Sequence, residues 1–301
     1  MNNSIVEEIS VVIPYFNDSK SIERCVNSVL SQTLLPREII IIDDSSNDSD
    51  LIPESIMTNS RVKYLRNYNN MNGAYCRNFG VEISNSKYIA FLDADDYWES
   101  NHLKYHFEYL ILKGVDFVYS NVISVNGNGS NKNRKVIDHE TYDGDYSDLL
   151  LLSPPQTNSF FGKRETFLNV KFDVTLKRHQ DYQLYMDMLQ SNYDVKYLDV
   201  YTSNHCTSHR PLSSRYDFES ALEFWKKYEH VVDRELYLNY LWLSLYLSFK
   251  TNGNIDAVLL RIKSYSSITL PNNLFGKVFT VLYFNVRYRL VHKLLNVING
   301  D

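Results

Sequence analysis

The chain has 301 residues, of which 44% are hydrophobic, so it can bury a sizeable core in one large domain, alone or with an appendage. Its 31 basic and 36 acidic residues give a net charge of −5, which excludes a global field that would draw it to nucleic acid or to an anionic membrane. The three cysteines, Cys25, Cys76 and Cys206, lack C-x-x-C spacing, which argues against a disulfide framework or a thiolate zinc site.

No signal for secretion or for crossing a membrane is evident in the sequence. Residues 1–8 lack a basic stretch followed by an apolar core, and no segment approaches the ~20 apolar residues that span a bilayer. The odd number of cysteines fits a reducing compartment. We therefore expect a cytoplasmic protein, either free or peripheral on the inner face of the cytoplasmic membrane.

Apolar runs alternate with helical spacing through the first 120 residues. Ile9–Ile13 and Glu38–Ile42 have the composition of strands buried on both faces, and Ser21–Ser31 between them has helical spacing. Further strands are expected at 62–65, 88–92 and 116–119, and further helices at 72–83 and 101–112. This alternation predicts an α/β fold with a mostly parallel sheet that binds ligands beyond the carboxyl ends of its strands.

Three of the expected strands end in polar or acidic residues, in the segments 14–17, 43–46 and 93–96. Because these ends lie at one edge of a parallel sheet, we expect the three segments to converge on one site. For Asp93 and Asp95, which share this edge with the Asp43–Asp44 pair, capping of a helix would leave too many carboxylates unexplained, and close like charges repel unless a cation joins them.

Asp93 and Asp95 form an Asp-x-Asp pattern directly after an apolar run. A hard divalent cation held by one or two carboxylates keeps positions free for phosphate oxygens, which suits a diphosphate leaving group. An EF-hand calcium loop fails, since Trp98 stands where glycine is required and Lys104 where the bidentate glutamate belongs. For Asp96, capping of the next helix is an acceptable explanation.

Beyond residue 213 the sequence consists of long helical patterns rich in Leu, Tyr and Trp, at 218–228, 236–249 and 275–298. They predict a C-terminal helical subdomain. The last segment is basic and amphipathic, which suits contact with a bilayer interface, and an ordinary core-packing helix explains it nearly as well.

Several segments together resemble the family 2 glycosyltransferases, inverting enzymes of the GT-A fold that include many bacterial O-antigen and capsule sugar transferases. The resemblance covers roughly the first 210 residues and is carried by the order and spacing of 11–17, 32–33, 38–46, 72–73, 77–80 and 88–96. It implies a GT-A, Rossmann-like sheet flanked by helices, with a C-terminal helical extension. The expected organisation is a nucleotide-sugar-binding half at 1–100, an acceptor-binding half at 101–213 and a helical subdomain at 214–301.

By this resemblance Pro14, Tyr15 and Asp44 cradle the nucleotide base. A carboxylate can accept the imide N–H of uracil, so the donor is expected to be a UDP-sugar. Asp93 is expected to reach the ribose or the donor sugar. The remaining expected donor contacts are Asn17, Asn72, Arg77, Ala94 and Arg210. For Arg77 a structural ion pair with the acidic rim is the alternative.

The metal, Mn²⁺ or Mg²⁺, is expected to bind Asp95. His205 or His209 could complete its coordination, or Arg210 could clamp a phosphate. A lone histidine in a loop is more often a surface or packing residue, and the sequence does not choose between the two.

By this resemblance Asp181 matches the catalytic base of the family. In many members the matching segment ends in Glu-Asp before a helix. Here Gln180 stands where many relatives carry glutamate. The alternative for Asp181 is a helix-N-terminal residue stabilised by the dipole, and a dipole that lowered its pKa would weaken it as a base.

Together these features predict inverting transfer of a sugar of the Glc, Gal or GlcNAc type from a UDP-sugar to a hydroxyl of a lipid-diphosphate-linked saccharide, in synthesis of O-antigen or another surface polysaccharide. A nucleotidyltransferase acting on sugar phosphates would need a Gly-rich phosphate loop after the first strand, which is absent. A catalytically silent nucleotide-sugar or glycan-binding module is the other alternative, and retention of Asp95 and Asp181 argues against it.

Overall fold

The computed structural model describes residues 4–126, 131–206, 218–250 and 258–262. The chain divides into two compact units. The first comprises Met1–Asp143 and Ser153–His209, and the second comprises Gly144–Leu152 and Arg210–Asp301. The expected helical subdomain therefore shares its unit with a short segment from the middle of the chain.

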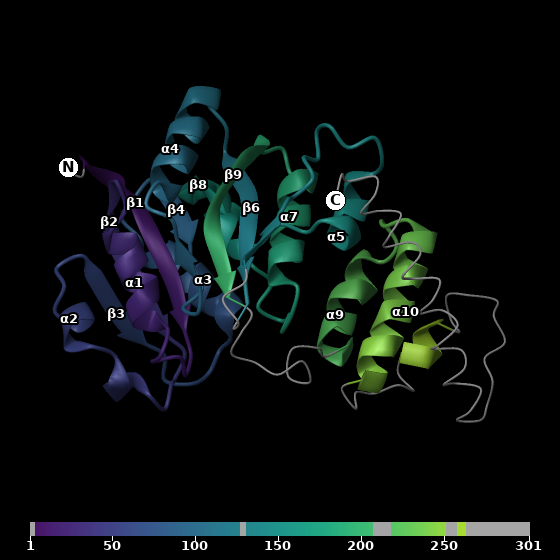
Figure 1. Ribbon diagram of the computed structural model, residues 1–301, viewed down its shortest axis with the longest axis horizontal. Coiled ribbons are helices and arrows are strands. Elements are labelled where there is room, and N and C mark those ends of the chain that lie inside the picture. The colour runs from purple at the N-terminus through teal and green to yellow at the C-terminus, as the bar shows by residue number, and fades with distance from the viewer. Residues whose placement is uncertain (1–3, 127–130, 207–217, 251–257, 263–301) are drawn as a thin grey trace. The chain divides into compact units, whose positions relative to one another are not determined.

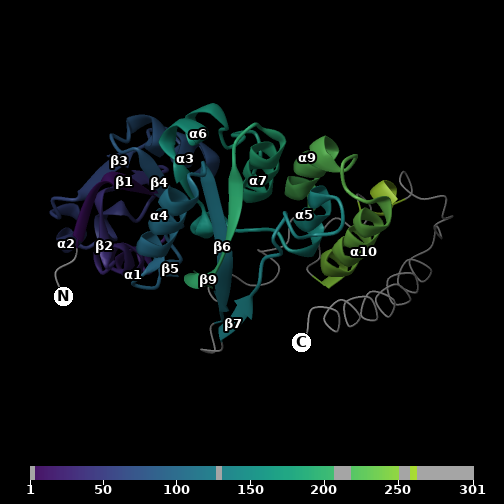
Figure 2. The same ribbon diagram turned by 90° about the horizontal axis from the view of Figure 1, so that it is seen from above.

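One curled sheet forms the centre of the first unit (Figure 1). Its strands follow the order β3 (Val62–Arg66), β2 (Leu34–Asp43), β1 (Ser4–Tyr15), β4 (Tyr88–Phe91), β8 (Phe161–Lys163), β6 (Phe117–Val125), β9 (Val195–Cys206) and β5 (Tyr97–Trp98). The first four are mutually parallel, as are β6 and β9, whereas β8 is antiparallel to both of its neighbours. Figure 2 shows β6 and β9 side by side, with β7 (Asn131–Arg134) paired to the end of β6.

The helices of the first unit are α1 (Ile22–Leu30), α2 (Glu54–Met57), α3 (Gly73–Ile83), α4 (His102–Lys113), α6 (Arg164–Asn169) and α7 (Gln180–Gln190). Short 3₁₀ turns lie at Ser49–Leu51 and Thr157–Ser159 of this unit, and another lies at Tyr146–Asp148 of the second unit. Each strand and helix predicted in the first 120 residues is present, with ends that differ by a few residues. The prediction of an α/β fold with a mostly parallel sheet is confirmed.

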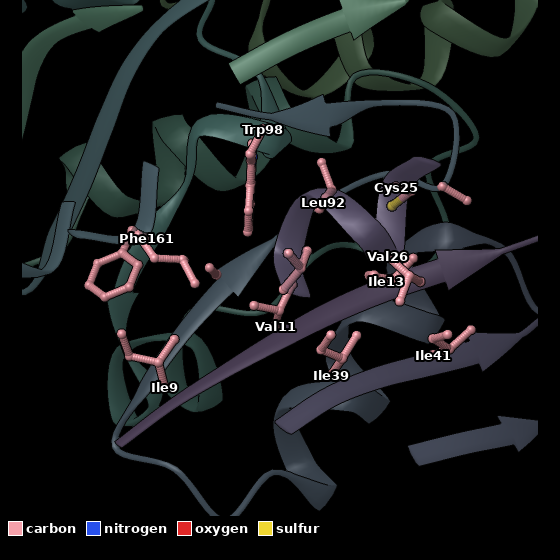
Figure 3. Close-up of a cluster of buried hydrophobic side chains, with 14 of the residues drawn as sticks. Ile9, Val11, Ile13, Cys25, Val26, Ile39, Ile41, Leu92, Trp98 and Phe161 are labelled. Atoms are coloured by element: carbon pink, nitrogen blue, oxygen red, sulfur yellow. The ribbon is translucent and has the colours of Figure 1, made fainter. Parts of the chain in front are cut away.

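Both faces of β1, β2 and β4 are buried, as their apolar runs predict. On one face Ile9, Val11 and Ile13 of β1 pack with Cys25 and Val26 of α1 (Figure 3). On the other face Ile40 and Ile42 of β2 pack against Cys76 of α3. The free thiols of Cys25, Cys76 and Cys206 are all buried.

Helix α3 lies unusually close to β1 at Gly80. A Cβ atom at this position would overlap Cγ1 of Val12 and lie 3.0 Å from its Cγ2. Only a glycine permits this approach, because valine is stiff and cannot turn aside. The contact fixes the height of α3 over the sheet, and with it the position of Arg77, which lies almost one turn earlier.

The second unit is helical within its described residues. It contains α5 (Leu149–Leu152), α9 (Phe218–Tyr228) and α10 (Arg234–Lys250), so two of the three predicted C-terminal helices are present. Phe224, Trp225 and Tyr237 form its buried aromatic centre. The third predicted segment, 275–298, lies outside the described residues. Among the helices that are described, none is long and apolar enough to cross a membrane.

Candidate active site

The ends of β1 and β2 are joined at the carboxyl edge of the sheet. The backbone N–H of Asp44 donates to the Tyr15 carbonyl at 2.8 Å, and the N–H of Asn17 donates to Ser46 Oγ at 3.0 Å. Asn17 Oδ1 in turn accepts from the Asn47 N–H at 2.7 Å. Since β4 is parallel to β1, the segment that follows it reaches the same edge.

Left-handed backbone is concentrated in the segments that carry the expected site residues. Within the described residues the non-glycine positions with positive φ are Asn17 (51°), Ser45 (66°), Asn72 (80°) and His179 (60°). The first two follow β1 and β2, the third begins α3, and the fourth precedes Asp181. Such conformations are uncommon outside glycine, and they gather where surrounding structure fixes a functional geometry.

Asp43 is fully buried at the end of β2, and hydrogen bonds satisfy its carboxylate. It accepts from the Ser46 N–H at 2.8 Å, from Ser49 Oγ at 2.6 Å and from the Tyr64 hydroxyl. Burial raises its pKa, but these hydrogen bonds outweigh burial and leave the pKa below its ordinary value. The negative charge of Asp43 is therefore stabilised by hydrogen bonds within the protein.

The neighbouring Asp44 carboxylate organises the loop that leads into α3. It accepts from Asn67 Nδ2 at 2.9 Å and from the N–H groups of Met71 and Asn72 at 2.8 and 2.7 Å. Burial and a hydrogen bond to Asp44 raise the pKa of the Cys76 thiol, which is thus a further donor to this carboxylate. A uracil imide would share the carboxylate with these donors.

Asn72 fastens this loop to a distant segment. Its Oδ1 caps α3 by accepting from the Tyr75 N–H at 3.1 Å, and its Nδ2 donates to the Val174 carbonyl at 2.7 Å. The loop before α3 and the loop before α7 are thereby held together.

The exposed aromatic ring at the end of β1 belongs to Phe16 and not to Tyr15. Tyr15 is fully buried, and its hydroxyl donates to Asp48 Oδ1 at 2.7 Å, so a nucleotide could meet only its backbone. Phe16 is 49% exposed. Phe16 is not among the site residues expected from the sequence, and alternation alone does not predict its exposure, because Val12 on the other face of β1 is also buried.

Arg77 joins the donor side of the expected site to the start of α7. It is only 7% exposed and lies over the Phe172 ring. Its Nη2 donates to Asp93 Oδ1 at 2.5 Å, and its Nη1 donates to Gln180 Oε1 at 2.9 Å. The predicted ion pair with the acidic rim is thus present, and the guanidinium touches both expected halves of the site.

Asp181 lies in the first turn of α7, next to Gln180. Burial raises its pKa to about 6, against the opposing effects of the Tyr182 N–H and of the charges on Arg77 and Arg134. The pKa of Asp181 is therefore raised and not lowered, although the residue lies at the helix N-terminus. A carboxylate with this pKa is suited to accept a proton near neutral pH.

Asp96 is buried and does not cap a helix. It is followed by β5, and Asn101 occupies the N-cap position of α4. Its carboxylate accepts from Asn158 Nδ2 at 2.8 Å and from the Cys206 N–H at 2.7 Å, and it lies 3.2 Å from His205 Nδ1. Asp96 therefore ties the end of the Asp-x-Asp segment to β9.

His205 lies in strand β9 and not in a loop, contrary to expectation. Burial lowers its pKa, but the hydrogen bond with Asp96 and the charges of Asp96, Asp95 and Asp93 raise it above its ordinary value overall. Because Nδ1 faces Asp96, Nε2 is the nitrogen that could bind a metal or meet a phosphate. The other expected residues of this region, His209 and Arg210, lie outside the described residues.

The donor set fits a cation shared between protein and substrate better than one enclosed by protein. Asp95 is half-buried at the rim, and Arg24 holds its backbone carbonyl at 2.5 Å. In the described part of the chain, no three His, Cys, Asp or Glu side chains form a metal-binding group. Asp95 and His205 could together offer two ligands, and a histidine held by a carboxylate is the usual arrangement for metal binding.

Comparison with known proteins agrees with the fold. The family model described as Glycosyl transferase family 2 matches residues 10–175, more than half of the chain, and its match ends six residues before Asp181. A crystal structure of S. aureus TarS in complex with UDP-GlcNAc has a TM-score of 0.56 and 19% identity, and the alignment covers 86% of this chain and 71% of that one.

Two relatives illustrate the sequence matches. The chain is 31% identical over 120 residues to the Escherichia coli UDP-Glc:alpha-D-GlcNAc-diphosphoundecaprenol beta-1,3-glucosyltransferase WfgD, covering 40% of this chain and 47% of that protein. It is 29% identical over 191 residues to the amylovoran biosynthesis glycosyltransferase AmsB of Erwinia amylovora, covering 58% and 62%. The chain thus spans about half the length of several curated relatives that it matches.

Proposed function

Because the chain belongs to glycosyl transferase family 2, we propose that it transfers one sugar, of the Glc, Gal or GlcNAc type, from a UDP-sugar to a hydroxyl of a lipid-diphosphate-linked saccharide, with inversion. The names of WfgD and AmsB support the substrate classes and a role in polysaccharide synthesis. A lipid-linked acceptor places the reaction at the inner face of the cytoplasmic membrane.

The observation that carries the proposal is the hydrogen-bonded chain Asp93–Arg77–Gln180, which ends beside Asp181. It brings a carboxylate suited to the donor and a carboxylate suited to a base to one place. A silent binding module has no need for the second carboxylate, that of Asp181. Burial raises its pKa to about 6, which suits a group that accepts a proton near neutral pH.

In this proposal the donor lies along the carboxyl ends of β1, β2 and β4. The uracil meets Asp44 and the exposed ring of Phe16, with backbone contacts from Pro14, Tyr15 and Ala94. Asn17 and Asn72 shape the loops around the base. Asp93, held by Arg77, accepts from hydroxyls of the ribose or the donor sugar.

A divalent cation, Mn²⁺ or Mg²⁺, is part of the proposal, with Asp95 and His205 as its protein ligands. When bound, it neutralises the charge that develops on the departing diphosphate. Asp96 holds His205 in the orientation that turns Nε2 away from the carboxylate.

Asp181 acts as the general base. It accepts the proton of the acceptor hydroxyl while that oxygen bonds to the anomeric carbon, and the bond from that carbon to the UDP oxygen breaks on the opposite face. One carboxylate suffices for this single displacement, unlike the carboxylate pairs of glycosidases.

The test is incubation of the chain with UDP-Glc, UDP-Gal or UDP-GlcNAc, Mn²⁺ and GlcNAc-diphospholipid, with UDP and the lipid product measured together. Release of UDP with equimolar extension of the lipid is the expected result. Formation of pyrophosphate from a nucleoside triphosphate and a sugar phosphate would instead favour the nucleotidyltransferase. If UDP-sugars bind but no sugar is transferred to the lipid acceptor, the binding module would be favoured.

A further inference from the structure

Gln180 makes two hydrogen bonds that hold the start of α7. Its Oε1 accepts from Arg77 Nη1 at 2.9 Å, and its Nε2 donates to the Leu176 carbonyl at 2.7 Å. The first bond crosses 103 residues of sequence and the second closes the loop before the helix. The space is tight, since a Cβ added at Gly73 would lie 3.2 Å from Arg77 Nη1 and 3.6 Å from Gln180 Oε1.

Gln180 is neutral, so it does not compete with Asp93 for the charge of Arg77. The guanidinium is nearly shielded from solvent and forms its ion pair with Asp93. A glutamate at position 180 would present a second carboxylate to the same guanidinium, because its oxygen would occupy the place of the amide Oε1. That carboxylate would also lie beside Asp181 in the sequence and in space.

We propose that Gln180 is a positioning residue, whose amide docks the start of α7 on the Arg77–Asp93 pair without adding charge next to Asp181. This inference rests on the proposed role of Asp181 as the base. The amide oxygen of Gln180 holds the start of α7 against Arg77. Because the amide is neutral, the positive charge of Arg77 still lowers the pKa of Asp181. The two contributions can be separated, because alanine removes both and glutamate removes only the second.

The charged and titratable groups that face Asp181 come from three elements and from its own loop. Arg77 of α3 and Arg134 of β7 favour the ionised carboxylate, and Asp93 after β4 opposes it. His179, whose pKa burial lowers to about 4, is neutral at the pH of interest. A glutamate at position 180 would weaken the largest favourable charge and add an unfavourable one, so it should raise the pKa of Asp181.

The experiment compares Gln180→Ala and Gln180→Glu with Gln190→Glu, which makes the same change at an exposed position of the same helix. For Gln180→Glu we expect the acidic limb of kcat/KM to move up by about one pH unit, with a rate close to wild type above that limb. For Gln180→Ala we expect kcat to fall roughly tenfold at every pH with little change in the KM for the donor. Gln190→Glu should leave the profile in place.

A purely structural role would lower the melting temperature of both variants and leave the pH profile unmoved, and that result would overturn the proposal. An equal shift with Gln190→Glu would do so too. If no substrate is turned over, the titration of the Asp181 carboxyl by ¹³C NMR, assigned with Asp181→Asn, still decides the matter. If the pKa of Asp181 is higher in Gln180→Glu and not in Gln190→Glu, the positioning role is supported although the proposed function has failed. An unchanged pKa of Asp181 in Gln180→Glu would refute the positioning role.

Discussion

Arg77 donates to Asp93 across 2.5 Å from a position that is almost closed to solvent, although the two residues lie on different elements 16 positions apart. Screening by water and salt is weak for such a pair. Because the same guanidinium also binds Gln180, its charge reaches Asp181 at the start of α7. The protonation of the proposed base is therefore set by groups inside the protein.

The first prediction concerns this base. Burial raises the pKa of Asp181 to about 6, so the carboxylate is available above that pH and kcat/KM should fall as the pH drops through it. Asp181→Asn should lower kcat by about 10²- to 10⁴-fold and spare the affinity for UDP. The matched control is Asp50→Asn at an exposed position. Full turnover by Asp181→Asn would refute the assignment.

The same shift has a consequence for stability. A carboxyl whose folded-state pKa is raised favours folding at low pH and loses that contribution as the pH rises through 6. Asp181→Asn should therefore raise the melting temperature at pH 8 more than at pH 5. Equal changes at both pH values would indicate that the carboxyl titrates normally in the folded protein.

The second prediction concerns the metal. Asp95→Ala should abolish the gain in UDP affinity that Mn²⁺ provides, because it removes a proposed ligand of the metal. The affinity for UDP in the presence of EDTA should stay unchanged. Titration calorimetry with and without the metal measures this, with Asp50→Ala as the control. A gain as large as that of the wild type would remove Asp95 from the proposed metal site.

The third prediction concerns Phe16. Its exposed ring offers a face on which a base can stack, an interaction worth about 1–3 kcal/mol per base. Phe16→Ala should weaken UDP binding roughly tenfold or more, whereas Phe16→Tyr should retain it. Leu51→Ala changes an apolar residue that is 68% exposed and serves as the control. If both alanine variants bind UDP like the wild type, the base lies elsewhere.

A stack of buried histidines lies away from the proposed chemistry. The rings of Trp98, His102 and His106 follow one another at 4.2 and 4.1 Å. His106 Nδ1 lies 2.8 Å from the His102 carbonyl, which can only accept, so Nδ1 carries the proton and Nε2 accepts from Ser120 Oγ at 3.0 Å. Burial lowers the pKa of both histidines, that of His106 to about 4.

The fourth prediction follows from this stack. The unfolded histidines bind protons below about pH 6.5, whereas folded His106 stays neutral until about pH 4, so stability is lost as the pH falls between these values. For His106 the loss is on the order of 3 kcal/mol. His106→Asn should flatten the pH dependence of urea unfolding, although it lowers stability at pH 7. The exposed His230→Asn should leave the slope as it is.

The fifth prediction concerns the contact between α3 and β1. Gly80→Ala should destabilise the fold by about 1–3 kcal/mol, because the new methyl group overlaps Val12, and this exceeds the gain of about 1 kcal/mol in helix propensity. Adding Val12→Ala should recover part of the loss. A double-mutant cycle from denaturant unfolding measures the coupling, and strict additivity would show that the two residues do not clash.

Strands β1, β2 and β4 could be predicted because they are buried on both faces and so read as mostly apolar runs, as in Ile39–Ile42. The later strands lack that signal. β8 has only three residues, and β9 buries Thr202, Ser203 and Asn204, whose polarity conceals a strand. Their hydrogen bonds to residues far along the chain make that burial acceptable.

Candidate site residues could be named from sequence, but their partners could not. Asp96 reads as a cap because the strand that buries it arrives 110 residues later. The neutral Gln180 is visible in the sequence, whereas its bond to Arg77 depends on a fold that brings together residues 103 positions apart. The exposure of Phe16 and the burial of Tyr15 depend on where β1 ends and on the bond between the Tyr15 hydroxyl and Asp48, which is 33 residues away.

The bonds from Asn72 to Asp44 and to Val174 bear on how this chain could be re-engineered. A loop fastened to Asp44 on one side and to Val174 on the other cannot be exchanged by itself for that of another transferase. A graft that aims to change donor preference would have to carry residues 67–72 and 172–176 together. The two loops, about a hundred residues apart in the sequence, would therefore have to be exchanged as a pair.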